Sequence, residues 1–146
     1  MSQLETLVGE EMVSPWREIT QAAIRDFADI TGDQQWIHID EDRARRESVY
    51  GSTVAHGFLT LALISRLLRD AVGAIEGTRM SINYGLNKVR FPAPVPAGSR
   101  VRARCTLLQV EPIDGGLQAT WNVLIERDGS EKPCCAAEWV VRYYNA

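Results

Sequence analysis

The sequence predicts an α+β domain in which one long central helix is wrapped by a curved antiparallel sheet of about five strands. Three observations support this. Residues 58–72 are apolar on almost every side, as expected of a helix that its neighbours bury. In the second half of the chain apolar and polar residues alternate, which is the period of strands. Two glycine-containing turns, at residues 114–116 and 128–130, divide that half into hairpins.

The composition indicates a single globular domain over residues 1–146. With 45% hydrophobic and 24% charged residues, the chain can bury a core and does not resemble a disordered segment. Its net charge of −3 gives no electrostatic reason to expect nucleic acid or an anionic membrane as a partner.

The cysteines and the first residues indicate the compartment. Of three cysteines, Cys134 and Cys135 are adjacent, and the set provides neither a disulfide framework nor metal-ligand spacing. The N-terminus lacks the basic start and apolar stretch of a secretory signal, and no apolar run approaches the ~20 residues that span a bilayer. We therefore expect a cytoplasmic protein.

The first elements are a strand and a helix. Residues 14–19 are expected to form a strand at a sheet edge, because Pro15 cannot donate a hydrogen bond to a neighbouring strand. Thr20 is a candidate N-cap for a helix whose apolar residues recur at helical spacing. Gly32 is of the residue type that favours the end of such a helix.

Further helices and then strands follow. Residues 39–46 begin with carboxylates and end with arginines, the order that a helix dipole favours, and predict a short solvated helix. The buried helix is expected to begin at Gly57 and end at Gly73. Strands are predicted at residues 80–91, 101–107, 117–126 and 134–144. This is the order of elements in the hot-dog fold. Because an open sheet leaves edges to cover, we expect a homodimer.

The residues that could perform chemistry lie between positions 31 and 57, which include both histidines of the chain. Asp33 follows a predicted helix end, and His38 lies five residues later on the same connection. If the chain folds back between them, the carboxylate and the imidazole can share one water molecule and move its proton. A turn aspartate and a hydrogen-bonded, partly buried histidine are the structural alternatives.

Gly57 could supply a third part of such a site. As the first residue of the buried helix, its N–H has no intrahelical partner and could donate to a developing oxyanion. Glycine there permits the close approach of a ligand carbonyl; the alternative is that it only lets the helix pack tightly. His56, directly before it, is expected to fix the entry to the helix.

Together these motifs resemble the MaoC-like dehydratase family, which includes the (R)-specific enoyl-CoA hydratases. The resemblance rests on Gly32-Asp33 followed by His38, on Ala55-His56-Gly57 entering an apolar helix with Ser65 eight residues on, and on residues 88–99, a strand end rich in proline, valine and glycine. It covers the chain from about residue 20 onward, and the combination is more specific than any single motif.

The resemblance implies roles for four residues. Asp33 and His38 match the catalytic aspartate and histidine that activate the water. Gly57 matches the residue whose N–H binds the thioester carbonyl, and Ser65 matches a hydroxyl near the catalytic aspartate. The resemblance also implies a hot-dog dimer that acts on thioesters of coenzyme A or an acyl carrier protein. It implies no metal and no redox cofactor, since coenzyme A is part of the substrate.

One pair of positions departs from the family pattern. Asn-Pro is usual where this chain has Gln35 and Trp36, and tryptophan has neither the rigidity nor the size of proline. We expect both residues to shape the substrate pocket. Arg90 is a candidate for contact with the phosphates of coenzyme A. The alternating arginines within residues 100–104 are expected to form a solvated strand face instead.

The sequence therefore predicts a hydro-lyase that hydrates trans-2-enoyl-CoA to (R)-3-hydroxyacyl-CoA, or catalyses the reverse dehydration. A hot-dog acyl-CoA thioesterase is one alternative, disfavoured because the buried helix carries no carboxylate from Gly57 to Arg69. A non-catalytic acyl-thioester-binding subunit is the other, and the joint presence of the four predicted site residues argues against it.

Overall fold

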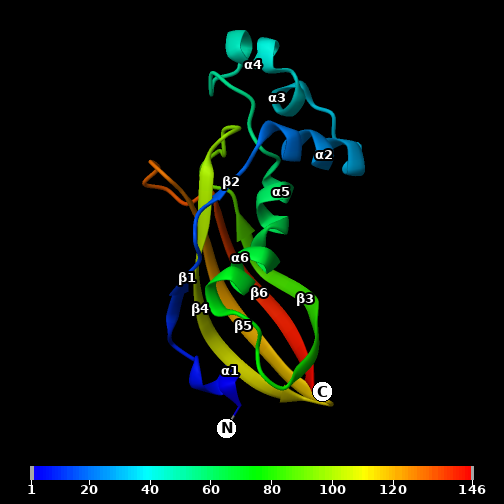
Figure 1. Ribbon diagram of the computed structural model, residues 1–146, viewed down its shortest axis with the longest axis vertical. Coiled ribbons are helices and arrows are strands. Elements are labelled where there is room, and N and C mark those ends of the chain that lie inside the picture. The colour runs from blue at the N-terminus through cyan, green and yellow to red at the C-terminus, as the bar shows by residue number, and fades with distance from the viewer. Residues whose placement is uncertain (1, 146) are drawn as a thin grey trace.

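The strands of the protein form one antiparallel sheet that curves around the central helices (Figure 1). This computed structural model describes residues 2–145, and within them the sheet has six strands in the order β1-β4-β5-β6-β3, with β2 also paired to β4. Their bounds are β1 Glu11–Val13, β2 Arg17–Glu18, β3 Thr78–Arg90, β4 Arg100–Ile113, β5 Gly116–Arg127 and β6 Cys135–Asn145. The predicted α+β class with a central helix and a curved antiparallel sheet is confirmed.

The long strands bury one side because their side chains alternate. In β4 every second side chain of residues 101–107 is fully buried, and the residues between them are partly exposed. Leu107 lies opposite Trp121 of β5, so apolar side chains of neighbouring strands meet on the same face. Register shifts within β3 and β4 add the local bends that irregular pairing produces.

Six helices lie in the described part of the chain. They are α1 Gln3–Thr6, α2 Gln21–Thr31, α3 Trp36–Ile39, α4 Glu41–Glu47, α5 Gly57–Ala62 and α6 Ile64–Val72. The predicted caps of α2 are confirmed, with Thr20 at its start and Gly32 at its end. Within residues 2–145, no helix combines the length and the apolar character needed to cross a membrane.

The helix predicted over residues 57–72 is present but divided. Leu63 separates α5 from α6; its N–H lies near the carbonyls of both Leu59 and Thr60, which tightens the turn there. The expected burial on almost every side is wrong, because a single sheet covers only one face of the helix. Phe58, for example, is 71% exposed.

Residues 14–19 do not form the single edge strand that the sequence predicts. Instead β1 and β2 pair with β4 on either side of Pro15, whose missing N–H interrupts the ladder. The Ser14 hydroxyl fills part of the gap by accepting the Ala103 N–H at 2.9 Å. The connection after α2 also differs from expectation, because it contains the short helix α3.

Helices α2, α3 and α4 lie beyond one end of the sheet, whereas α5 and α6 run along its inner face (Figure 1). Residues 53–55 join the two regions. The Ala55 N–H donates to the Val95 carbonyl at 2.8 Å, and the Ala97 N–H donates to the Thr53 carbonyl at 2.9 Å. On its other side this segment bonds to α3 through the Val54 N–H, so α3 is held against an extended strand-like segment.

The burial of two leucines predicts that their substitution by alanine affects stability very differently. Leu67 of α6 is fully buried, whereas Leu108 of β4 is 46% exposed. Leu67→Ala should lower the free energy of unfolding by about 2–5 kcal/mol, because it leaves a cavity under the sheet. Leu108→Ala should change it by less than about 0.5 kcal/mol, as is usual for surface positions. Denaturant unfolding at one fixed protein concentration measures both; equal losses would contradict this account of the core.

Candidate active site

Asp33 follows α2 at a left-handed turn. Gly32 ends the helix with φ of 76°, a conformation that glycine adopts without steric cost. Asp33 itself is exposed, and its carboxylate accepts a long hydrogen bond of 3.4 Å from the Gln35 N–H. The carboxylate is therefore placed on the connection between α2 and α3, as the sequence predicts.

His38 lies in α3 and is buried, with 7% of its surface exposed. Its Nδ1 is 2.6 Å from the Val54 carbonyl oxygen. Because a carbonyl only accepts, Nδ1 carries the proton, and a neutral ring leaves Nε2 free to accept one. Burial lowers the pKa of His38 from the usual 6.5; the Val54 carbonyl opposes this shift and the nearby His56 adds to it. The ring is therefore a neutral base at pH 7.

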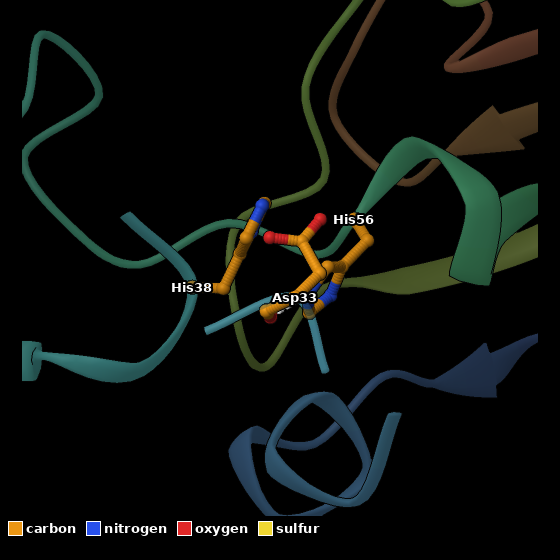
Figure 2. A group of neighbouring side chains, drawn as sticks. All are labelled: Asp33, His38 and His56. Carbon is orange, nitrogen blue, oxygen red and sulfur yellow. Dashed lines mark hydrogen bonds between the residues drawn. The ribbon is translucent and has the colours of Figure 1, made fainter. Parts of the chain in front are cut away.

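Asp33, His38 and His56 form one cluster, in which one side-chain ligand atom of each lies within 4.8 Å of the others. Figure 2 shows the Asp33 carboxylate beside the His38 ring, with His56 on the other side of the aspartate in this view. The two imidazoles stack with centroids 3.7 Å apart and planes inclined by 20°. Three segments of the chain therefore converge on one small region.

The cluster has the residue types of a metal site but lacks its geometry. Nearly parallel rings direct their nitrogen lone pairs in separate planes, whereas metal ligands converge to about 2 Å from one centre. Two of the four ring nitrogens also face backbone carbonyls: Nδ1 of His38 faces Val54, and Nε2 of His56 faces Asp33 at 3.0 Å. The arrangement is better suited to holding a water molecule and moving its proton.

Gly57 and His38 line the same cavity of about 280 Å³. Gly57 begins α5, and its N–H makes no hydrogen bond within residues 2–145. A Cβ at this position would lie 3.3 Å from the ring of Phe91, tighter than ordinary van der Waals contact. A larger residue here would therefore press on this ring, whereas glycine leaves the ring in place.

Cys134 also lines this cavity but is not a nucleophile there. Burial raises the pKa of its thiol to about 12, and the thiol donates to the Ile125 carbonyl at 3.1 Å. A thiol with this pKa is neutral at pH 7 and unreactive.

Comparison with known proteins decides the family. The sequence profile of the MaoC-like domain matches residues 3–126 of this chain. The protein belongs to the MaoC-like dehydratase family. It is therefore an enzyme of the hydro-lyase class, as predicted.

Several proteins resemble this MaoC-like dehydratase along most of its length. The 3-hydroxyacyl-thioester dehydratase Z of Mycobacterium tuberculosis is 50% identical over 145 residues, which cover 98% of this chain and 95% of that protein. Nodulation protein N of Rhizobium meliloti is 42% identical over 142 residues, with coverages of 96% and 88%. A crystal structure of the MaoC-like dehydratase from Rhodospirillum rubrum has a TM-score of 0.79 at 23% identity, covers 100% of this chain and 98% of that one, and supports the hot-dog fold.

In this MaoC-like dehydratase Gln35 and Trp36 occupy the start of α3. Gln35 is exposed at the N-cap position and its side chain caps nothing. Trp36 is partly buried beneath the Arg43 guanidinium, whose carbon lies 4.2 Å from the ring centroid. Neither residue lines the cavity that contains His38. Their contact with substrate therefore stays a prediction.

Ser65 and Arg90 are not members of the cluster. Ser65 is exposed on α6 and lines a second cavity of about 400 Å³ between that helix and the sheet. Within residues 2–145 its hydroxyl makes no hydrogen bond to Asp33. Arg90 ends β3, where it is exposed and donates to the Val89 carbonyl at 2.7 Å. The roles expected of both residues stay predictions.

The alternating arginines of β4 face carboxylates on the outer side of the sheet. Arg102 lies 2.5 Å from Glu126, Arg104 bonds both Glu126 and Glu11, and Arg100 pairs with Asp128. These guanidinium groups are partly exposed and already paired. The prediction of a solvated strand face, rather than a phosphate site, agrees with this arrangement.

Two residues that support the site were not predicted. Gln21 donates to the His38 carbonyl at 2.8 Å, and the Thr53 hydroxyl donates to the Gln21 side-chain oxygen. Thr53 adjoins Val54, so this bridge fastens α3 to the segment that holds the His38 ring. Nothing in the sequence signals it, because Gln21 resembles any first residue of a helix.

His38 should make the stability of the fold depend on pH. Its pKa is lower in the folded than in the unfolded chain, so the unfolded chain binds more protons as the pH falls. The free energy of unfolding should be at its full value above about pH 6.5 and should decrease as the pH falls toward the folded pKa. Denaturant unfolding across this range should show a smaller decrease for His38→Gln than for the wild type. Equal slopes would contradict the lowered pKa.

Proposed function

We propose that this protein adds water to trans-2-enoyl thioesters of coenzyme A or an acyl carrier protein, giving (R)-3-hydroxyacyl thioesters, and catalyses the reverse dehydration. The observation that carries the proposal is the proximity of the Asp33 carboxylate to His38, a buried, neutral base that lines a cavity. The 50% identity to a 3-hydroxyacyl-thioester dehydratase over nearly the whole chain supports the substrate class.

The pair can hold and activate a water molecule. The Asp33 carboxylate oxygens and Nε2 of His38 can each accept a hydrogen bond, so together they can bind the two O–H groups of one water. As the water oxygen bonds to C3 of the enoyl thioester, its proton passes to one of these acceptors. A proton is then delivered to C2, so that the elements of water are added across the double bond. In the reverse direction the pair removes the C2 proton and protonates the leaving hydroxyl.

The Gly57 N–H can stabilise the negative charge that forms on the substrate. Negative charge develops on the thioester oxygen as C3 is attacked, and the unpaired Gly57 N–H can donate to that oxygen. The donor and the base line the same cavity, so one substrate can reach both. Loss of a single oxyanion donor typically lowers the rate about 10²–10³-fold.

The central helices disfavour a hydrolase. No carboxylate occurs from Gly57 to Arg69, and the first one after them, Asp70, is already engaged. It accepts hydrogen bonds from Arg17 at 2.7 Å and Arg66 at 2.9 Å, and these arginines hold the pKa of its carboxyl below the usual value. An ion-paired carboxylate of this kind is a poor base for thioester hydrolysis.

The proposal predicts which substitutions remove activity. Asp33→Asn and His38→Ala should each lower the hydration rate of crotonyl-CoA about 10²–10⁴-fold, because each removes half of the acid–base pair. Loss of the enoyl thioester absorbance, measured beside free thiol release, separates hydration from hydrolysis.

Asp26→Asn is the matched control, since Asp26 is an exposed carboxylate on α2 outside the cluster and should leave the rate unchanged. Thiol release would identify a thioesterase. If neither loss of the enoyl absorbance nor thiol release occurs with crotonyl and longer acyl chains, a non-catalytic binding subunit would be supported.

We also propose that two copies of the chain associate through β3. This strand is an edge of the sheet: within residues 2–145 it pairs only with β6, which leaves one row of its backbone groups open. Its apolar side chains are exposed at Met80, Ile82, Tyr84 and Leu86. A long apolar edge is an aggregation hazard unless it is covered, and a second copy can cover it by antiparallel pairing with its own β3.

Light scattering at micromolar concentration should give twice the chain mass of 16.3 kDa. Ile82→Lys should shift the protein toward the monomer, because it places a charge in the paired edge. Leu108→Lys is the control, since Leu108 is similarly exposed at 46%, against 43% for Ile82, but lies on β4. A wild-type monomer, or an equal effect of both substitutions, would contradict this interface.

A further inference from the structure

His56 contacts both members of the proposed catalytic pair. Its Nε2 lies 3.0 Å from the main-chain carbonyl oxygen of Asp33, and its ring stacks on the His38 ring with centroids 3.7 Å apart. The three residues come from separate segments: the connection after α2, α3 itself, and the residue before α5. His56 is therefore the side chain at which these segments are joined (Figure 2).

The contacts of His56 are those of a donor and a flat ring. Because a carbonyl oxygen only accepts, Nε2 of His56 carries the proton and donates to Asp33. Nδ1 is buried and has no hydrogen-bond partner within residues 2–145. A buried unpaired nitrogen destabilises a fold, and an apolar side chain of similar size would avoid that cost. Simple packing therefore does not explain a histidine here, whereas its two contacts do.

We propose that His56 is a positioning residue for the hydration reaction. Its N–H holds the Asp33 main chain and its ring face holds the His38 imidazole, so that carboxylate and base meet the same water molecule. This inference rests on the function proposed above.

The Asp33 side chain needs such support because it is weakly held. It is exposed, and the hydrogen bond from the Gln35 N–H to its carboxylate is long, at 3.4 Å. Fixing the Asp33 carbonyl limits where the Cα and the carboxylate can lie. Catalytic geometry is sensitive to such limits, since a displacement of about 1 Å can lower a rate about 10²-fold.

The stacked ring also affects the charge of the base. Burial is the largest cause that lowers the pKa of His38, and His56 adds to this effect, whereas Asp33 opposes it. The other titratable side chains of the cavity wall are Tyr50 and Cys134. Removal of the His56 imidazole should therefore raise the pKa of His38, and the acid limb of the rate profile should move to higher pH.

Three substitutions separate the two contacts. His56→Gln keeps an N–H donor near the position of Nε2 but removes the ring, His56→Phe keeps the ring but removes the donor, and His56→Ala removes both. His56→Ala should lower kcat about 10²-fold with little change in KM, because the substrate still binds while the pair is displaced. The glutamine and phenylalanine variants should fall between His56→Ala and the wild type.

Phe27→Leu is the matched control. Phe27 packs against the His56 ring with centroids 4.9 Å apart, and its substitution alters packing in the same cluster without removing either contact. It should lower the thermal midpoint but leave the acid limb where it is. A shift of the acid limb in Phe27→Leu equal to that in His56→Phe would reduce His56 to a packing residue and overturn the proposal.

The titration of His38 can be observed directly. The chain has two histidines, so His56→Phe in untagged protein leaves His38 as the only imidazole, and its NMR signals report its pKa without assignment. That pKa should be higher than in the wild type.

Wild-type kcat in His56→Ala, together with an unchanged His38 titration, would overturn this inference. If His56→Ala does not fold, the same result in His56→Gln and His56→Phe overturns it. A wild-type protein that hydrates no enoyl thioester would instead defeat the proposed function, and the His38 titration would still decide whether the two rings are coupled.

Discussion

The main chain of Val54 is the constraint on which the candidate site depends. Its N–H donates to the Ile37 carbonyl at 3.0 Å, and its carbonyl accepts from Nδ1 of His38 at 2.6 Å. Residues on either side of it bond to the segment at 95–97, which is anchored in the core by Val95. One extended residue therefore holds both the backbone and the side chain of α3, which is too short to be stable alone.

This dependence explains why the site is built mainly from polar contacts. A buried imidazole is tolerated when its N–H groups are paired, and the Val54 carbonyl provides that partner while leaving Nε2 free. The Gln21–Thr53 bridge and the His56 donor fasten the surrounding main chain in the same manner. The hydrophobic core under the sheet supplies the rigidity, and the polar contacts at its edge transmit it to the reacting groups.

The exposed apolar surface of the molecule follows from the cover that one sheet can provide. A single curved sheet can cover only one face of α5 and α6 and leaves β3 unpaired along one edge, so apolar side chains such as Phe58 and Ile82 remain exposed. The sequence pattern that indicates a helix buried on almost every side is accurate about composition. Burial on almost every side would need more cover than one chain provides, and we propose that a second copy supplies it.

Local signals in the sequence were sufficient to predict the α+β class, the caps of α2 and the long strands β3 to β6, because these depend on periodicity or on a capping residue. They also singled out Asp33, His38 and Gly57 as candidates, because these residues lie in compact motifs. The sequence did not reveal the break at Leu63, the helical turn of α3 or the contacts of Gln21 and His56. These depend on how segments far apart in the chain meet, and hydrogen bonds between such segments leave no periodic trace. The order of elements was therefore determined locally, whereas the tautomer of His38, the stacking of the two imidazoles and the separation of Ser65 from the cluster were decided only by tertiary packing.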